Sequence, residues 1–177
     1  GTFYLGVDNT AVYFSGKKTV ASADNFAYIY NVVDSGAGYE GGVYTEGVKT
    51  AYFVKADGTM DKAVVAEDHS KATEIVAGAV IPYLLNADGK MEVATYDDAA
   101  LKVKDHLTGT KVPFGKSRNA VDGTYMDATT KFVFVDVTKN DAGKVTKVKA
   151  NIVTGYKNVA DDTQNLFVVA DKSGKAL

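Results

Sequence analysis

Cysteine is absent from this 177-residue chain, and the sequence contains only two prolines and two histidines. Without cysteine there can be no disulfide framework, no thiolate metal site and no cysteine nucleophile. No apolar run approaches the roughly 20 residues of a membrane-spanning helix, so membrane insertion is not expected. The net charge of -2 provides no summed positive field, and we therefore do not expect nucleic acid as a partner.

The local signatures of common catalytic sites are also missing. His69 and His106 lie far apart and match no zinc-binding spacing. Gly115-Lys116-Ser117 resembles the end of a phosphate-binding loop, but the preceding Gly109 is displaced by one position and no helical pattern follows. No Gly-x-Ser-x-Gly elbow is present, although a hydrolase without such a signature stays open. We therefore predict that the chain is not an enzyme.

The abundant residues favour strands. The 17 Gly, 11 Tyr and eight Phe accompany many Val and Thr, a composition that fits pleated, half-buried surfaces. Lys131–Val137 is apolar on both faces, as in a central strand, whereas apolar and polar residues alternate from Val145 to Ile152. Short helical turns are expected only at Glu67–Thr73 and Asp97–Val103. The sequence predicts an all-β fold of antiparallel, sandwich-like or barrel-like units with little helix.

Turn residues separate the predicted strands at short intervals. Asp57-Gly58 and Asp88-Gly89 each lie between two apolar runs, and such pairs supply the positive φ angles of tight hairpins. The glycine-rich stretch 36–42 is expected to be a flexible hairpin loop. Hairpins are predicted over residues 52–65, 82–93, 132–148 and 166–177.

A weak internal repeat divides the chain. Asn25–Tyr30 resembles 131–135, and Tyr52–Gly58 resembles 166–172, so the order of the stretches is kept while their spacing drifts. Two related β modules are expected, and the final strand of the second is expected to be truncated or completed by further residues. The predicted modules are residues 1–66 and 67–177.

Four stretches of strand and turn sequence share a family pattern: Pro82–Met91, Asp127–Val135, Thr154–Val159 and Leu166–Gly174. They resemble the repeated β modules of S-layer-homology-domain-containing cell-surface proteins of gut Firmicutes. Ala160 stands where that family often has proline, and no S-layer-homology anchor sequence lies within the chain. The resemblance implies an extracellular, wall-attached protein of several modules, of which this chain would be an excised piece, and it implies no particular ligand.

The strand patterns also predict which side chains fill the core. Apolar residues on the inward faces should be buried, because removing apolar surface from water is the main stabilising term. The predicted core residues are Phe26, Tyr28, Phe53, Leu84, Phe132, Phe134, Val148, Ile152 and Phe167.

Two pairs of residues are candidates for binding. Tyr39 and Tyr44 flank glycines and could stack on a sugar ring or a partner protein, with ordinary cross-strand pairing as the alternative. Asp161 and Asp162 supply hard oxygen ligands suited to calcium, although no complete calcium-loop motif surrounds them.

The expected function is that of a structural or spacer module in a bacterial cell-surface layer, with neighbouring modules as partners. The first alternative is an adhesin module that binds a host glycan or protein. A fibre subunit that donates its open last edge to the next copy is a further alternative.

Overall fold

Strands dominate the computed structural model, and no helix within its described part reaches seven residues. Residues 69 and 122–123 are among those that the structure does not describe. The structure describes residues 2–6, 10–14, 26–68, 70–94, 102–112, 120–121, 124–126, 128, 130–159 and 163–170. Side chains are described for 26–68, 70–94, 126, 128 and 130–159. The predicted all-β class is confirmed.

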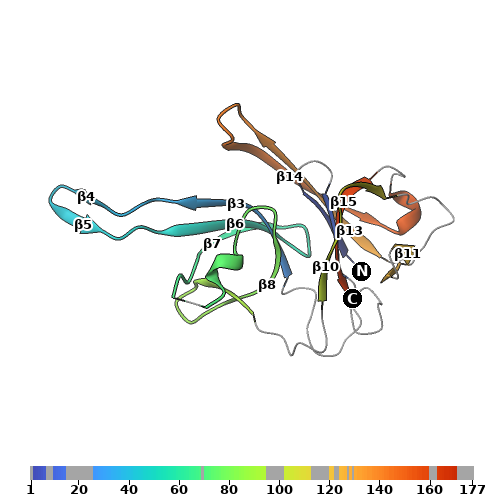
Figure 1. Cartoon of the computed structure of the whole chain (residues 1–177), viewed down its shortest axis with the longest axis horizontal. Helices are drawn as coiled ribbons and strands as arrows, with labels where there is room; N and C mark the ends of the chain where they lie inside the picture. Colours follow the sequence, from blue (N-terminus) through green and yellow to red (C-terminus); the bar gives the residue numbers. More distant parts are fainter. Residues whose placement is uncertain are drawn as a thin grey trace.

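A six-stranded sheet joins the two ends of the sequence (Figure 1). Its strands, in order across the sheet, are β10 (Lys102–Val112), β15 (Thr163–Ala170), β2 (Thr10–Phe14), β1 (Thr2–Gly6), β13 (Lys131–Lys139) and β14 (Val145–Thr154). Most neighbours are antiparallel, but β1 pairs with β13 and β15 pairs with β2 in parallel. These parallel pairs were not predicted, because they join strands that no local turn connects.

The middle of the chain builds a five-stranded antiparallel sheet. Its order is β7 (Met60–Val64), β6 (Lys49–Lys55), β3 (Phe26–Asp34), β8 (Val80–Leu85) and β9 (Met91–Val93). Two short hairpins complete the described strands: β4 (Gly38–Glu40) with β5 (Val43–Thr45), and β11 (Ala120–Val121) with β12 (Thr124–Tyr125). The 3-10 turns are η2 (Ala72–Glu74) and η3 (Tyr156–Asn158).

Local turn chemistry predicted three of these hairpins. β6–β7, β8–β9 and β13–β14 all form antiparallel pairs, and Gly58 and Gly89 take the positive φ angles that their turns require. The turn proposed near Glu67–Thr73 overlaps η2, whereas most of 97–103 and the end of the predicted 166–177 hairpin lie outside the described residues.

Strand pairing does not follow the predicted boundary between residues 66 and 67. β8 lies beyond that boundary yet pairs with β3, and β1 at the start of the chain pairs with β13. Pairing is selected by matching apolar faces rather than by nearness in sequence. Whether 1–66 and 67–177 are related repeats stays a prediction.

The main core lies between the two sheets. It joins residues of β3, β6 and β8 to the valines of β13, and half-buried residues of β14 pack against its margin. The buried members are Phe26, Tyr28, Val54, Ala56, Val80, Val133, Val135 and Val137. The opposite face of the five-stranded sheet is covered by a second cluster that includes Ile29, Phe53, Ile75 and Met91. β3 is therefore buried on both faces at its start, which explains its unbroken apolar run.

Two predicted core residues are exposed instead. Leu84 is 43% exposed because β3 pairs with β8 only from Val80 to Pro82, so the far end of β8 extends beyond the packed region. Ile152 is 39% exposed at the margin of the sheet interface, beside the β6–β7 turn at Gly58.

The other predicted core residues differ in how far their side chains are buried. Phe26, Tyr28, Phe53 and Phe132 are buried, as predicted. Phe134 and Val148 are half-buried, and the side chain of Phe167 lies outside the described residues.

Burial predicts the cost of truncating these side chains. Phe53 is 1% exposed, so Phe53→Ala should lower the free energy of unfolding by about 3–5 kcal/mol through lost apolar burial and the cavity left behind. Leu84→Ala is the matched control and should cost less than about 1 kcal/mol. Chemical denaturation measures both, and equal costs would contradict the described core.

Candidate functional site

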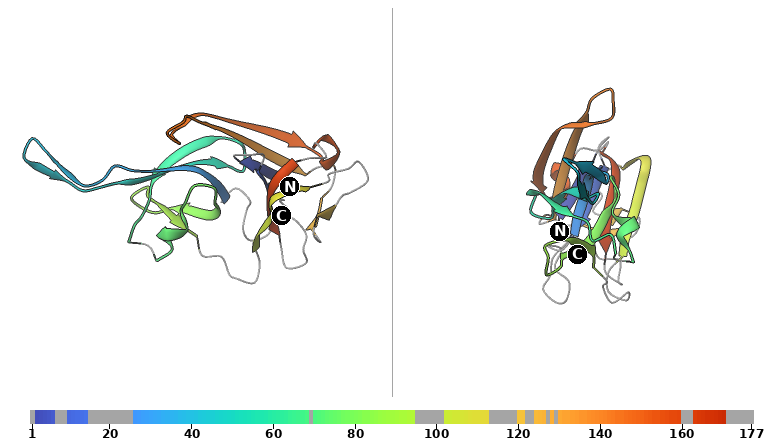
Figure 2. Two further views of the ribbon diagram at one scale, coloured as in Figure 1. Left: turned by 45° about the horizontal axis from the view of Figure 1, so that its top comes forward. Right: turned by 90° about the vertical axis from the view of Figure 1, so that its left-hand side faces the viewer.

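A long two-stranded ribbon protrudes from the body of the protein (Figure 1). β3 and β6 pair from Ala27–Lys55 to Asp34–Lys49, and β4 and β5 continue the hairpin outward. Figure 2 shows the same projection from a second direction. Every residue from Val33 to Glu46 is exposed, and we call residues 34–46 the ribbon.

The tip of the ribbon is set by two glycines. Gly41 and Gly42 connect the facing residues Glu40 and Val43, with φ angles of 59° and 82°. Positive φ at both central positions is typical of a type I′ turn, whose twist matches that of the strands it joins. The stretch predicted to be a flexible hairpin loop is a hairpin, with paired strands and a regular turn in place of a loose loop.

Tyr39 and Tyr44 lie directly opposite each other on β4 and β5. Their ring centroids are 5.3 Å apart with planes at 60°, an edge-to-face contact. Tyr39 is 78% exposed and Tyr44 57%, with Val43 at 68% on the other face of the ribbon. The two tyrosines therefore pair across the strands and are also exposed, and they lie on strands rather than in a loop. Binding through their rings stays a prediction.

The neck of the ribbon is held by one serine and a close backbone crossing. Ser35 N–H donates to Val48 O at 3.0 Å, and Val48 N–H donates to Ser35 Oγ at 2.9 Å. A Cβ on Gly47 would lie 2.8 Å from backbone atoms of Gly36 and Ala37, so only glycine allows this approach. These contacts fix where the ribbon leaves the sheet.

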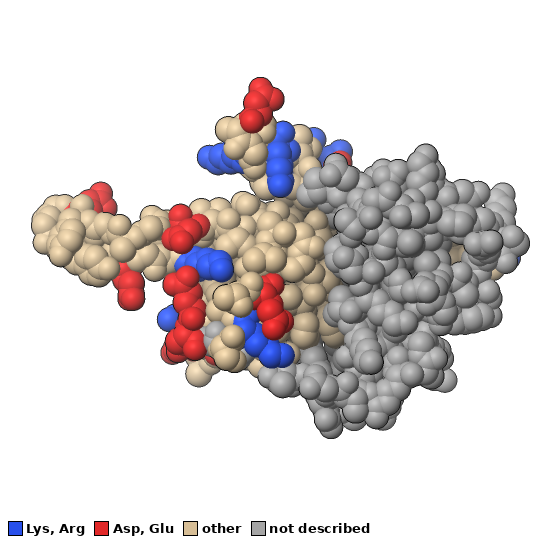
Figure 3. Space-filling model, viewed as in Figure 1, with Lys and Arg blue, Asp and Glu red and all other residues tan. Residues whose placement is uncertain are grey.

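The ribbon is acidic. Asp34, Glu40 and Glu46 lie within it, and the sequence from 34 to 46 contains no lysine or arginine. Figure 3 shows the acidic side chains along an otherwise uncharged projection. Exposed aromatic and apolar side chains of the ribbon therefore lie near carboxylates, and the ribbon has no lysine or arginine.

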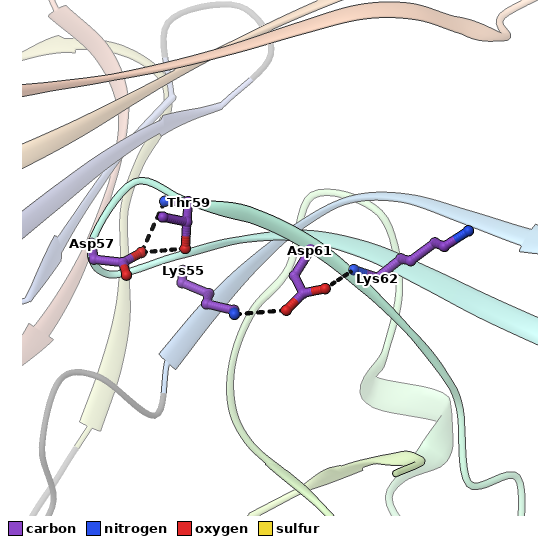
Figure 4. Close-up of polar contacts among 5 residues, drawn as sticks. All are labelled: Lys55, Asp57, Thr59, Asp61 and Lys62. Carbon is purple, nitrogen blue, oxygen red and sulfur yellow. Dashed lines mark hydrogen bonds and ion pairs between the residues drawn. The ribbon is translucent and has the colours of Figure 1, made fainter.

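A second polar cluster lies at the β6–β7 turn (Figure 4). Lys55 Nζ lies 2.6 Å from Asp61 Oδ2, and Asp61 Oδ1 accepts from Lys62 N–H at 2.8 Å. The hydrogen bond from Lys55 lowers the pKa of Asp61, and the same bond raises the pKa of Lys55. The ion pair and the hydrogen bond stabilise the turn.

Asp57 completes the turn on its other side. Its Oδ1 accepts from Thr59 N–H at 2.8 Å and from Thr59 Oγ at 2.6 Å. Partial burial acts to raise the pKa of Asp57, but the two bonds from Thr59 and the charge of Lys55 outweigh it, so the pKa is lowered. The cluster has the local bonding expected of a structural turn.

The hairpin formed by β13 and β14 carries the opposite charge, and we call it the lysine hairpin. Figure 3 shows lysine side chains gathered on it, with an acidic group near its end. Lys147 and Lys149 are exposed on β14, opposite Thr138 and Asp136. The sequence predicts these lysines as the solvent-facing side of a strand, because they alternate with Val148, and this alternation already indicates a charged surface.

The predicted calcium ligands Asp161 and Asp162 lie outside the described residues, as does His69. His106 lies on β10, where only the backbone is described. Within the described residues, no group of three or more His, Asp or Glu side chains is placed to hold a metal ion. The calcium site stays a prediction.

Comparisons with known protein families, with curated proteins and with solved structures gave no match to this chain. Among the described residues, no helix has the length and apolar character needed to cross a membrane.

The lowered pKa of Asp61 predicts a pH-dependent effect. A folded-state pKa below the unfolded value gives stability above the unfolded pKa that is lost as pH falls through the folded pKa. Asp61→Asn should therefore lower the free energy of unfolding by about 0.5 kcal/mol at neutral pH, a small cost because the ion pair is partly exposed. The difference from the parent should shrink below about pH 4.

Denaturant titrations across that pH range measure the difference. A Lys55→Gln, Asp61→Asn double variant should cost less than the sum of the single variants, because each removes the same contact. A cost that is unchanged by acid would contradict this account of the turn.

Proposed function

We propose that this chain is a non-enzymatic structural module of a bacterial cell-surface protein, located outside the cell. In this role the two packed sheets form a rigid body, and the ribbon is its contact element for neighbouring modules of the same protein or layer. The resemblance of Asp127–Val135 and Leu166–Gly174 to S-layer-homology surface proteins supports the location.

The observation that carries the proposal is the exposure of aromatic and apolar side chains on an ordered ribbon. Tyr39, Val43 and Tyr44 do not belong to either core cluster of the body. Their exposure is unfavourable in water and would be relieved by burial against another surface. A regular hairpin with a fixed neck loses less conformational entropy on binding than a flexible loop, so it suits a contact role.

The directions of β1 and β15 are consistent with this role. Thr2 of β1 pairs with Phe14 at the end of β2, and β15 runs parallel to β2 toward the same end. The chain therefore enters β1 and leaves β15 at one end of the six-stranded sheet. The ribbon projects away from that sheet (Figure 1). A module joined covalently at that end of the sheet would therefore not cover the ribbon.

Surface labelling of intact source cells tests the proposal. Antibodies raised against the purified chain should label intact cells, and brief protease treatment of those cells should remove the signal. Labelling that appears only after the cells are permeabilised would contradict a cell-surface module. A cytoplasmic protein of the same cells serves as the control for cell integrity.

The second candidate is an adhesin module, and the exposed tyrosine pair favours it. Aromatic faces stack on sugar rings and on protein surfaces, and both rings stand clear of the body. The predicted calcium ligands Asp161 and Asp162 make calcium dependence part of this candidate.

Binding to arrays of host glycans and matrix proteins, with and without calcium, tests the adhesin. A Tyr39→Ala, Tyr44→Ala variant should lose at least about tenfold in affinity if these rings form the contact. Leu85→Ala removes an exposed apolar side chain elsewhere and should have no effect. An absence of binding by the parent chain would reject this candidate.

A further inference from the structure

The lysine hairpin and the ribbon carry complementary charge. Between 136 and 149 the sequence has lysines at 139, 144, 147 and 149 against aspartates at 136 and 141. The ribbon has three carboxylates and no basic residue. Figure 3 shows the two groups on separate projections of the molecule.

The lysines are available to a partner. Lys147 and Lys149 are both exposed, and they are two residues apart, so they share one face of β14. Among the described residues, the ion pair formed is that of Lys55 with Asp61, and it involves neither lysine. Asp136 lies opposite Lys149 on β13 without forming a close ion pair, and Lys147 lies opposite the uncharged Thr138, so both lysines can still pair with a partner's carboxylates.

The hairpin also offers a strand edge and apolar surface. β14 is the outermost strand of its sheet in the described structure. Its other face carries Val145, Val148 and Ala150, which are half-buried, and Ile152, which is exposed. An edge of this kind can accept a further strand, with side chains on alternate positions supplying selectivity.

We propose that the ribbon of one copy docks on the lysine hairpin of a second copy of this chain. The tips of the two projections diverge in Figure 1, so the contact is made between molecules. The inference rests on the proposed function and deepens it, because it names the partner of the ribbon.

Several interactions act together in this contact. The carboxylates at the tip and the base of the ribbon, Glu40 and Glu46, reach Lys147 and Lys149 from the margins of the contact as exposed ion pairs, each of modest strength. The rings of Tyr39 and Tyr44 can receive the lysine ammonium groups and cover their apolar stems. The docking is thus selective through charge and stabilised by aromatic burial.

The symmetry of the contact follows from its two different surfaces. A ribbon bound to a hairpin uses unlike patches, so a bound pair still has a free hairpin on one copy and a free ribbon on the other. Such head-to-tail contacts continue as a chain or close as a ring. This is the arrangement by which modules can extend a surface layer.

The rival explanation is that the lysines only protect an exposed edge. Lysine on edge strands hinders unwanted pairing, and β14 is such an edge. In that case the chain stays monomeric, and the carboxylates of the ribbon have no connection with the hairpin. The two explanations differ in their response to paired substitutions.

Sedimentation velocity over a concentration series tests the docking. The purified chain should associate at low salt, and its affinity should fall at least about tenfold between about 0.01 M and 0.5 M salt as charges are screened. A ribbon variant, Glu40→Gln with Tyr44→Ala and Glu46→Gln, and a hairpin variant, Lys147→Gln with Lys149→Gln, should each be monomeric alone.

Mixing the two variants gives the sharpest readout. The hairpin variant keeps an intact ribbon and the ribbon variant keeps an intact hairpin, so the mixture should form a one-to-one dimer and nothing longer. Lys62→Gln with Lys90→Gln removes two exposed lysines of the other sheet and should associate as the parent does. Circular dichroism and thermal melting confirm that each variant is folded.

Three results would overturn the docking: a parent that is monomeric at every concentration in low salt, association that persists in both variants, or a mixture that stays monomeric. The cell-labelling experiment reads location alone. Surface labelling with a monomeric parent would therefore reject this inference and leave the proposed function standing.

Discussion

The packing of three valines of β13 against the five-stranded sheet is the contact on which the rest of the structure depends. Val133, Val135 and Val137 meet Phe26, Tyr28 and Val54 in one cluster, and these groups come from opposite halves of the sequence. β1 then pairs along β13, so the six-stranded sheet is positioned by the same strand. Because the other face of the five-stranded sheet is also covered, its central strands cannot separate without exposing both clusters.

The ribbon follows from where that packing ends. β3 and β6 continue to pair beyond the last buried residues, and from Val33 outward no described element covers them. Backbone pairing, the type I′ turn and the Ser35–Val48 bonds keep the extension ordered without a core. The aromatic groups of the ribbon can thus face solvent or a partner with little effect on the stability of the two packed sheets. The folding of the module therefore does not depend on the contacts that the ribbon makes.

Local chemistry made part of this structure predictable. Asp57-Gly58 and Asp88-Gly89 indicated their hairpins because the turn type is encoded in adjacent residues. The parallel pairs β1–β13 and β15–β2 were not predictable, since they depend on matches between distant segments. Leu84 and Ile152 have core-like patterns, but their burial depends on how far a neighbouring element extends. Tyr39 and Tyr44 were found as candidates from their glycine-rich surroundings, whereas the lysine hairpin needed the sheet order to be known.

Native-state hydrogen exchange in dilute solution at high salt, where copies are separate, tests the central claim most directly. The account predicts that amides of β6 and β13 exchange with the same free energy, equal to that of global unfolding, because the sheets open together. Amides of β4 and β5 should exchange far faster, since the ribbon can open without exposing either core cluster. Independent opening of β13, or a ribbon as protected as β6, would contradict a single cooperative body with a separate contact element.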